Sequence, residues 1–507
     1  MKNAVGGRVR EETPSPGHTT SPASDQASGR RRWWALGVTQ LAAFMILLDV
    51  SIVNVALPSI ERDLGVSAGS VQWVLSGYAL TLGLALVPAG RLGDTLGRRR
   101  MFLIALSAFV VTSALTGAAP TIGLLIAARL VQGVAGGILV PQNTGLIQEL
   151  FRGAERGRAF GVLGGTVGLA TAAGPVIGGL ILAAFTGPDG WRWVFYVNVP
   201  IGLLALVLAA RLVPSTRVGR VRDIRLDLVG TLLLGGGVLS LLLPLVDSEA
   251  VGLAEWYLFV VAVLLLGAFA WWERRTVRRG RQPLLDPRLA RTPGYAAGSG
   301  IALVYFAGFT GIGLVFALFF QDGLGYSPLH SGLAVTPFAL GVAASAVIAG
   351  RLVSRIGRWL TVSGLATVVV GLVATALVLR HVDGSAAAWA VAGPLLLAGL
   401  GGGMVTSPNI TLSLESVAVE MAGAAGGALQ TAQRIGSAIG TAALVAIFYE
   451  ALVRNGRDYP AAVYDALLCA SGVMLLALLM AVAELVRRHH HDRLLPVSRP
   501  EHDAHRV

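Results

Sequence analysis

Long apolar stretches recur along the whole chain, and short polar segments separate them. Each stretch has roughly the 17–25 residues that a helix needs to cross ~30 Å of hydrocarbon. Backbone groups inside a bilayer have no water to bond to, so such spans fold as helices. The pattern therefore predicts an all-α integral membrane protein with fourteen transmembrane helices, near residues 34–57, 71–92, 102–119, 121–147, 158–184, 194–212, 227–246, 256–272, 295–320, 330–353, 361–380, 388–412, 423–451 and 463–486.

The two ends of the chain have a different composition from the spans. Residues 1–32 are rich in Ser, Thr, Pro, Gly and charge, which is typical of a disordered tail. We expect a second polar tail at 488–507. The first apolar run starts late and has full spanning length, so the sequence does not indicate a cleavable signal peptide.

The basic residues fall mainly on one side of the predicted membrane. Of the 40 lysines and arginines, those in the loops of the other side are Arg62, Arg192, Arg380, Arg454 and Arg457. Loops that carry the positive charge stay in the cytoplasm. The distribution therefore predicts a multi-pass protein of the inner (plasma) membrane, with an even number of spans and both termini cytoplasmic.

The composition excludes several classes of function. Charged residues make up 13% of the chain, against roughly 25% in soluble domains, so an ordinary soluble enzyme is excluded. The one lysine is Lys2, so the chain lacks the lysine of a P-loop. The one cysteine is Cys469, and no histidine lies deep in a span, so we expect neither metal nor cofactor. The net charge of +12 follows from membrane topology, and we expect no nucleic-acid partner and no obligate protein partner.

The loops after the second and tenth spans repeat one pattern. Gly90 to Arg98 reads GRLGDTLGR, and Gly350 to Arg358 reads GRLVSRIGR. The first and ninth spans share nearly the same offset. Paired halves with a substrate site between them are typical of secondary transporters. We therefore expect a tail at 1–32, a six-helix half at 33–213, two inserted helices at 214–280, a second six-helix half at 281–487 and a tail at 488–507.

The first of these loops suggests a gate. Glycines let helix ends approach closely, and the carboxylate of Asp94 can pair with an arginine or with a helix N-terminus. The stretch from Gly90 to Arg100 resembles the loop signature between helices 2 and 3 of the major facilitator superfamily. The resemblance implies that conformational gating involves Gly90, Gly93, Asp94, Gly97 and Arg98. Ser354 replaces the acid in the second half, so any lock there would be weaker or use other partners.

Two charges inside apolar spans suggest a coupling site. Asp49 lies nine residues before Pro58, ~13 Å along a helix, and Arg129 lies eight residues after Thr121, ~12 Å. Both are therefore expected at similar depth. Ionisable residues in spans are costly and are usually functional. An acid paired with an arginine can release its partner on taking a proton, although a static structural ion pair is the alternative.

Four further motifs extend the resemblance over nearly the whole chain. Leu48 to Pro58 resembles the first-helix signature of the fourteen-helix drug:proton antiporter branch. Arg129 to Gly137 resembles the fourth-helix signature of the superfamily. Trp191 to Pro200 looks like another signature of that branch, and is also typical of an interfacial aromatic anchor. The remaining motif resembles the fifth-helix pattern of exporters and contains Gly174, Pro175, Gly178 and Gly179.

Polar residues in the spans are candidates to line a cavity. Gln430 and Arg434 share a helix face at spacing i,i+4, and Arg434 is the only mid-span cation besides Arg129. Asn54 and Gln132 are the corresponding candidates in the first half. The alternative for each is a hydrogen bond that only packs helices.

The resemblance implies the major facilitator fold and a function without enzymatic activity. We expect a proton-coupled antiporter that exports drug-like or natural-product small molecules by alternating access, with small molecule, protons and bilayer as its partners. A symporter that imports a metabolite is the main alternative, and the Gly174–Pro175 helix argues against it. A membrane enzyme is a further alternative, but the sequence shows neither an obvious nucleophile triad nor a His/Cys metal cluster that would support it. A sensor without transport would need an added soluble domain.

Overall fold

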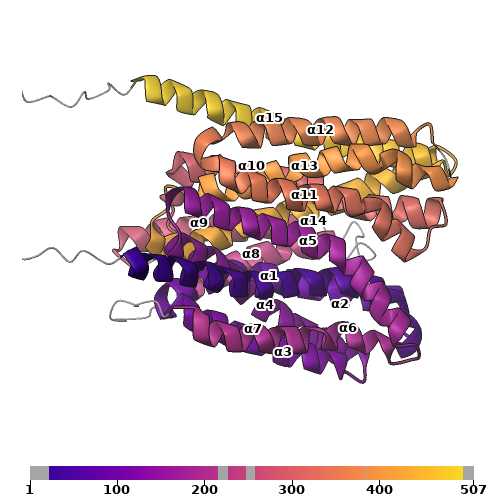
Figure 1. Ribbon diagram of the computed structural model, residues 1–507, viewed down its shortest axis with the longest axis horizontal. Coiled ribbons are helices and arrows are strands. Elements are labelled where there is room, and N and C mark those ends of the chain that lie inside the picture. The colour runs from indigo at the N-terminus through magenta and orange to yellow at the C-terminus, as the bar shows by residue number, and fades with distance from the viewer. Residues whose placement is uncertain (1–21, 215–226, 247–256, 282, 383, 495–507) are drawn as a thin grey trace, which may run out of the picture.

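The computed structural model describes residues 22–214, 227–246, 257–281, 283–382 and 384–494, and these residues are almost entirely helical. The helices run side by side along the long axis of the molecule (Figure 1). The long helices are α1 (Pro22–Leu64), α2 (Ala68–Leu96), α3 (Arg98–Gly117), α4 (Ile122–Leu150), α5 (Gly153–Ala184), α7 (Asn198–Leu212), α8 (Leu228–Val246), α9 (Tyr257–Arg278), α10 (Pro293–Leu318), α11 (Pro328–Ile356), α12 (Trp359–Leu379), α13 (Ala387–Ser413), α14 (Ala422–Arg454) and α15 (Tyr459–Leu494). Shorter elements are η1 (Gly190–Arg192), α6 (Trp193–Tyr196), η3 (Leu289–Arg291), η4 (Phe319–Gly323), η5 (Gly384–Ala386) and η6 (Val419–Met421).

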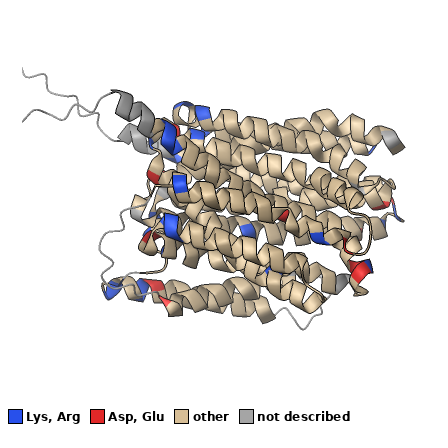
Figure 2. Ribbon diagram, turned by 60° about the horizontal axis from the view of Figure 1, so that its bottom comes forward, with Lys and Arg blue, Asp and Glu red and all other residues tan. Residues whose placement is uncertain are grey.

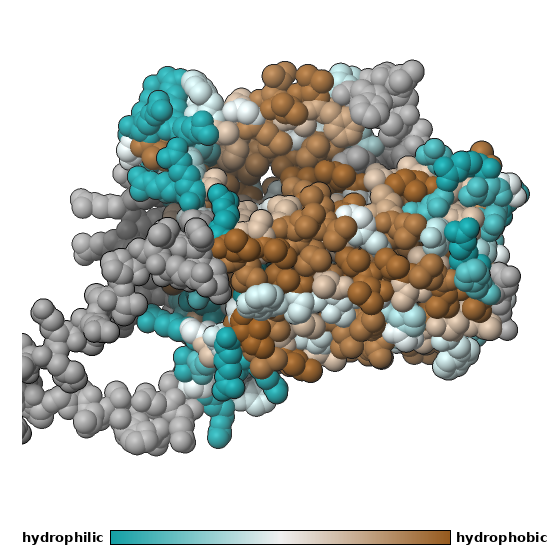
Figure 3. All heavy atoms as spheres, turned by 90° about the horizontal axis from the view of Figure 1, so that it is seen from above, coloured by the Kyte–Doolittle hydropathy of each residue, from teal (hydrophilic) through white to brown (hydrophobic). Residues whose placement is uncertain are grey.

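The helices have the length and surface of membrane spans. Among the described residues, 13 helical segments are long and apolar enough to cross a bilayer. The remaining predicted span is α8, whose apolar part Leu228–Pro244 is shorter. The space-filling view shows a wide apolar band, with hydrophilic residues gathered towards the two ends (Figure 3). The prediction of an all-α, multi-pass membrane protein is confirmed.

The structure differs from the sequence prediction at both ends of the chain. Helix α1 begins at Pro22, inside the segment 1–32 that was expected to be disordered. Near this start, Arg32 donates to the Leu150 carbonyl at 3.3 Å and pairs with Glu155 at 3.6 Å. These contacts place Arg32 against the end of α4 and the start of α5. Helix α15 likewise runs to Leu494, into the predicted tail at 488–507, and residues 1–21 and 495–507 lie outside the described part.

The chain packs as two bundles that lie one above the other in Figure 1. Helices α1–α7 form the lower bundle and α10–α15 the upper one. Helices α8 and α9 pack on each other, and α8 contacts α2 and α14. Helix α1 begins, and α15 ends, at the left end of Figure 1, which we call the terminal end. The start of α1 and the end of α15 lie at the same end of the molecule, as an even number of crossings requires.

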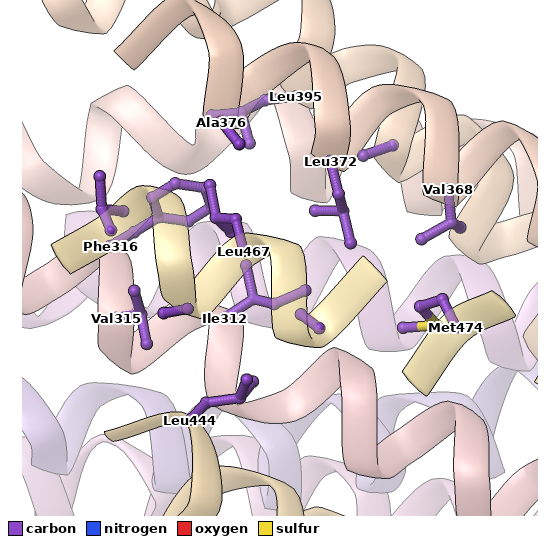
Figure 4. Packing of buried hydrophobic residues seen from close by; sticks show 14 of the residues in the cluster. Ile312, Val315, Phe316, Val368, Leu372, Ala376, Leu395, Leu444, Leu467 and Met474 are labelled. Carbon is purple, nitrogen blue, oxygen red and sulfur yellow. The ribbon is translucent and has the colours of Figure 1, made fainter. Parts of the chain in front are cut away.

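Each bundle has its own apolar core. In the upper bundle, Phe316 of α10, Leu372 of α12 and Leu467 of α15 meet in one cluster (Figure 4). In the lower bundle, Phe102 and Phe109 of α3 belong to a separate cluster. Large side chains therefore hold helices together within a bundle, and this makes each bundle a packing unit.

Small residues bring the backbones of the two bundles close together at two helix pairs. Helix α2 packs on α14, and α5 packs on α11. A Cβ added at Gly90 would lie 2.3 Å from the Gly423 carbonyl oxygen, and one at Gly350 would lie 2.5 Å from that of Gly157. Gly90 and Gly350 occupy the same place in the repeated loop pattern. The two contacts are therefore related by the internal repeat, and each depends on backbones that approach closely.

The repeated loop also turns in the same way in both bundles. Gly97 ends α2 with φ 96°, and Gly357 ends α11 with φ 61°. L-residues with side chains rarely adopt a positive φ, which explains glycine at both positions. The backbone thus supports the repeat that the sequence indicates.

Glycine also allows a close helix contact within the upper bundle, and Gly440 of α14 provides a test of it. A Cβ there would lie 1.7 Å from the Ala307 carbonyl oxygen of α10, whereas a Cβ at Gly313 meets nothing within 4 Å. Overpacking costs about 1–3 kcal/mol or more, so Gly440→Val should lower the thermal unfolding midpoint of the purified protein, while Gly313→Val should leave it nearly unchanged. Equal midpoints for the two variants would contradict this packing.

Candidate functional site

A fully buried ion pair joins α1 and α4. Arg129 Nη1 lies 2.6 Å from Asp49 Oδ2, and both side chains are 0% exposed. An unpaired charge at this depth would cost several kcal/mol, so each residue neutralises the other. The two residues that the sequence places at similar depth are therefore in contact.

Three more helices contribute partners to this pair. Asn198 of α7 donates to Asp49 Oδ1 at 2.7 Å. Gln132 of α4 donates to the same oxygen at 3.4 Å and to Ser113 Oγ of α3 at 2.7 Å. Arg129 Nε donates to the Val74 carbonyl of α2 at 3.0 Å. The network therefore links five helices of one bundle. A change of charge at Asp49 would disturb the contacts among these helices.

Aromatic rings close the network on the side of Arg129. Its guanidinium carbon lies 4.1 Å from the centre of the Tyr78 ring and 5.7 Å from that of Phe195. Stacking of this kind stabilises a desolvated guanidinium. Arg129 Nη2 and the Tyr78 hydroxyl are both buried without a hydrogen-bond partner in the described structure. The site therefore keeps donor capacity that a rearranged state could use.

Two residues of this network differ from the sequence-based expectation. Gln132 was expected to line a cavity, but it is buried beside Asp49 and Arg129 and hydrogen-bonds to both. Asn198 was not singled out at all. It lies in the aromatic stretch from Trp191 to Pro200, and the signal was available, because an amide in an apolar span is as costly as other polar groups there.

A cavity of about 110 Å³ lies between the two bundles. Gln430, Gln433 and Arg434 of α14 line it from one bundle, and Asn143 of α4 lines it from the other. Gln430 and Arg434, which the sequence suggested as candidates to line a cavity, are among these residues. Asn54 does not belong to its lining, because this residue is exposed and donates to the Val50 carbonyl of its own helix at 3.1 Å.

A second buried carboxylate connects the two bundles at the terminal end. Asp94 of α2 accepts hydrogen bonds from the backbone amides of Gly423 at 3.1 Å and Ala424 at 3.0 Å. These amides open α14, where the first-turn donors lack helical partners and the helix dipole favours a negative charge. We call this contact the inter-bundle latch.

Arg98 fixes the Asp94 carboxylate in place. Its guanidinium lies 2.9 Å from Asp94 Oδ1, donates to the Gly145 carbonyl at 2.6 Å and reaches Glu149 at 3.4 Å. It also donates to the Val419 carbonyl, across the bundle contact. Both partners predicted for Asp94, an arginine and a helix N-terminus, are thus present.

The equivalent loop of the second bundle makes different contacts. Arg358, the counterpart of Arg98, lies 2.9 Å from Glu484 of α15 and donates to Asn409 of α13 at 2.7 Å. All three belong to the same bundle. Ser354, the counterpart of Asp94, is exposed. The charged contact between bundles is therefore asymmetric: the first-bundle loop makes one through Asp94, and its counterpart instead fastens its own bundle.

The glycine and proline motif of α5 packs against two neighbours. A Cβ at Gly174 would lie 2.2 Å from Ser51 of α1, and one at Gly178 would lie 3.4 Å from Ile52. Pro175 faces α11, because a Cβ at Gly332 would lie 2.8 Å from its Cβ. Gly179 has more space, with Leu329 at 3.9 Å. The motif thus brings α5 close to α1 of its own bundle and to α11 of the other.

Comparison with known proteins gives consistent matches. Residues 40–441 match the family described as Major Facilitator Superfamily. The "Probable actinorhodin transporter" of Streptomyces coelicolor is 36% identical, over 87% of this chain and 76% of its own length. The "Puromycin resistance protein pur8" of Streptomyces alboniger is 37% identical, over 90% and 92%. The "Tetracenomycin C resistance and export protein" of Streptomyces glaucescens is 33% identical, over 86% and 79%.

Solved structures share the same fold. The human organic anion transporter MFSD10 (TETRAN) aligns with a TM-score of 0.64 at 15% sequence identity, over 89% of this chain and 99% of its own. The proton:xylose symporter XylE aligns with a TM-score of 0.61 at 15% identity, over 90% and 96%. At this identity the likeness establishes the fold alone, and it agrees with the predicted major facilitator fold.

The latch predicts faster exchange at the start of α14 when its carboxylate is removed. A hydrogen bond to a charged group contributes ~1.5–3 kcal/mol, so Asp94→Ala should speed hydrogen–deuterium exchange of the Gly423 and Ala424 amides by roughly tenfold or more. The matched control is Ser354→Ala, at the equivalent but exposed position, which should change nothing there. Unchanged exchange in Asp94→Ala would show that the latch does not hold these amides.

Proposed function

Because this chain belongs to the Major Facilitator Superfamily, we propose that it is a proton-coupled antiporter that exports drug-like or natural-product small molecules. Protons would move inward down their gradient across the inner membrane while the molecule leaves the cell. The chain is a membrane transporter related to drug and antibiotic efflux proteins and not to enzymes. The direction, the coupling ion and the class of cargo are the proposed steps.

The names of several relatives support export. Proteins that share at least 33% identity over most of this chain are described by resistance to puromycin or by resistance to and export of tetracenomycin C. Resistance by transport requires that the molecule leaves the cell. The close packing of Gly174 and Pro175 in α5 agrees with the exporter pattern that the sequence resembles.

The observation that carries proton coupling is the ion pair of Asp49 with Arg129. It is fully buried and is the centre of a network over five helices. A proton on Asp49 would remove the negative charge and leave the guanidinium uncompensated in a medium of low dielectric constant. Arg129 would then need other acceptors, and α1 and α4 would have to move relative to each other. Protonation therefore selects a conformation.

The latch suggests which two conformations would alternate: one in which it is formed and one in which it is broken. With Asp94 bound to the start of α14, the two bundles are closed at the terminal end. When these hydrogen bonds break, the bundles could separate there and open the cavity to that side. Alternating access works by this kind of rocking of two repeats around a site between them.

The terminal end is proposed to be the cytoplasmic one. In Figure 2, ribbon segments of Lys and Arg (blue) gather mainly at the left end, which is the terminal end of Figure 1, and fewer lie at the opposite end. Segments rich in arginine are retained in the cytoplasm during insertion. Cargo would therefore enter from the side of the latch and leave on the other side.

Asp49→Asn tests the proposal. In inverted vesicles with an imposed pH gradient, addition of an exported compound should collapse the gradient for the native protein. The variant lacks the ionisable group, so its substrate-induced collapse should fall at least tenfold, towards background. The matched control is Asp189→Asn, because Asp189 pairs with Arg192 at a surface where its side chain is 76% exposed; surface pairs contribute little, so this variant should behave as native.

Two outcomes would count against the proposal. Collapse that survives in Asp49→Asn would place the proton site elsewhere. Compound transport that continues at the same rate without any pH gradient would remove proton coupling altogether.

A further inference from the structure

We propose that the cavity between the bundles binds an anion, and that Arg434 holds the acidic group of an aromatic or similarly planar cargo molecule. This inference rests on the proposed function, because it names the chemical class of the molecule that is exported. It starts from the charge balance of the cavity.

Arg434 lacks the kind of partner that the other mid-span arginine has. Arg129 is neutralised by Asp49 at 2.6 Å. For Arg434, the described structure contains neither a hydrogen bond nor an ion pair, and its electrostatic neighbour is the phenol of Tyr78. The residues that line the cavity include neither aspartate nor glutamate. A cation at this depth without a counter-charge is costly, so an anion that enters the cavity would gain a strong interaction.

The polar groups around Arg434 favour the same kind of ligand. Gln430 and Gln433 lie on the same helix, and neither has a side-chain hydrogen bond among the described residues. Each amide offers two N–H donors, and the guanidinium offers five. A carboxylate, phenolate or enolate can accept from several of these donors at once, and a planar guanidinium matches a carboxylate in a bidentate manner.

The remaining lining favours an apolar body. Phe102, Phe306, Leu139 and Ile46 contribute to the cavity wall. Flat aromatic molecules bury well against such side chains. A lipophilic cation would meet the same wall but would be repelled by Arg434 and find no carboxylate in the lining.

The volume shows how much of the ligand fits in this form. The cavity measures about 110 Å³, while sites for drug-sized ligands measure ~300–1,000 Å³. In the closed form it therefore admits an acidic group but not a whole molecule. The bundles must separate to admit the rest, which agrees with a site that alternates between open and closed forms.

Three fluorescent probes of one ring system would test the charge preference. Anthracene-9-carboxylate, its methyl ester and 9-(aminomethyl)anthracene are an anion, a neutral molecule and a cation of similar size. They are titrated against the purified full-length protein in lipid nanodiscs, with empty nanodiscs subtracted. The anion should bind at least tenfold more tightly than the ester and the amine.

Substitutions then assign this preference to one residue. Arg434→Gln should weaken binding of the anion about 10- to 100-fold, as expected for loss of a hydrogen-bonded charge, and change binding of the ester by less than about threefold. Arg434→Lys keeps the positive charge but loses the planar guanidinium that can bind a carboxylate through two hydrogen bonds, so its affinity for the anion should be intermediate. The matched control is Arg62→Gln, because Arg62 is exposed and donates to the Pro58 carbonyl of its own helix; this variant should bind as native.

The inference is overturned if the three probes bind equally, if the amine binds best, if the anion fails to bind, or if Arg434→Gln keeps the preference for the anion. If Arg434→Gln does not fold, the ranking of the probes on the native protein and the Lys variant decide. The titration uses no proton gradient, so it is independent of the vesicle experiment with Asp49→Asn. If antiport fails while the anion still binds, the proposed function is wrong and the anion site stands. If antiport is observed but the anion shows no preference, the anion site is wrong and the proposed function stands.

Discussion

A bilayer offers no water to a buried charge, and this constraint determines where the polar side chains of the protein lie. Asp49 and Arg129 neutralise each other inside one bundle, and Asp94 finds amides at the start of α14. Arg434 does not follow this rule, since it faces a cavity without a counter-charge among the lining residues. Unlike Asp49 and Arg129, Arg434 therefore lies where a ligand could reach it and supply the counter-charge.

The kind of contact also decides which parts can move. Phe316, Leu372 and Leu467 pack in one cluster within a bundle, which favours movement of that bundle as one body in the proposed transport cycle. The contact between bundles depends on glycines such as Gly90 and Gly350 and on a carboxylate bound to helix amides. Close glycine contacts and a few hydrogen bonds can break and form again, while separation would also part the apolar cluster to which Phe160 and Leu414 belong, because it spans both bundles. The structure therefore combines rigid units with a contact that is suited to rocking.

The sequence predicted spans and motifs better than it predicted which way each side chain faces. Spans follow from the length of apolar runs, and the depth of Asp49 and Arg129 follows from helix rise. Gln132 lies three residues after Arg129 and so shares its face, a spacing that already indicated the network. Asn54 lies five residues after Asp49, which turns it well away from Asp49. The contact with Asn198 required knowing how α7 packs on α1, because rotation of one helix against another is set by tertiary packing.

The separation of Asp49, the proposed proton site, from the cavity limits how proton and cargo could be coupled. Asp49 lies in one bundle and has no place in the lining of the cavity, so proton and cargo would not compete for one carboxylate. Coupling must then pass through shared elements. Helix α4 carries both Arg129 and the cavity residue Asn143, so it is one element that the two sites share. A shift of α4 that follows protonation would change the shape of the cavity, and a bound ligand would resist or favour the same shift, because linkage between two sites acts in both directions.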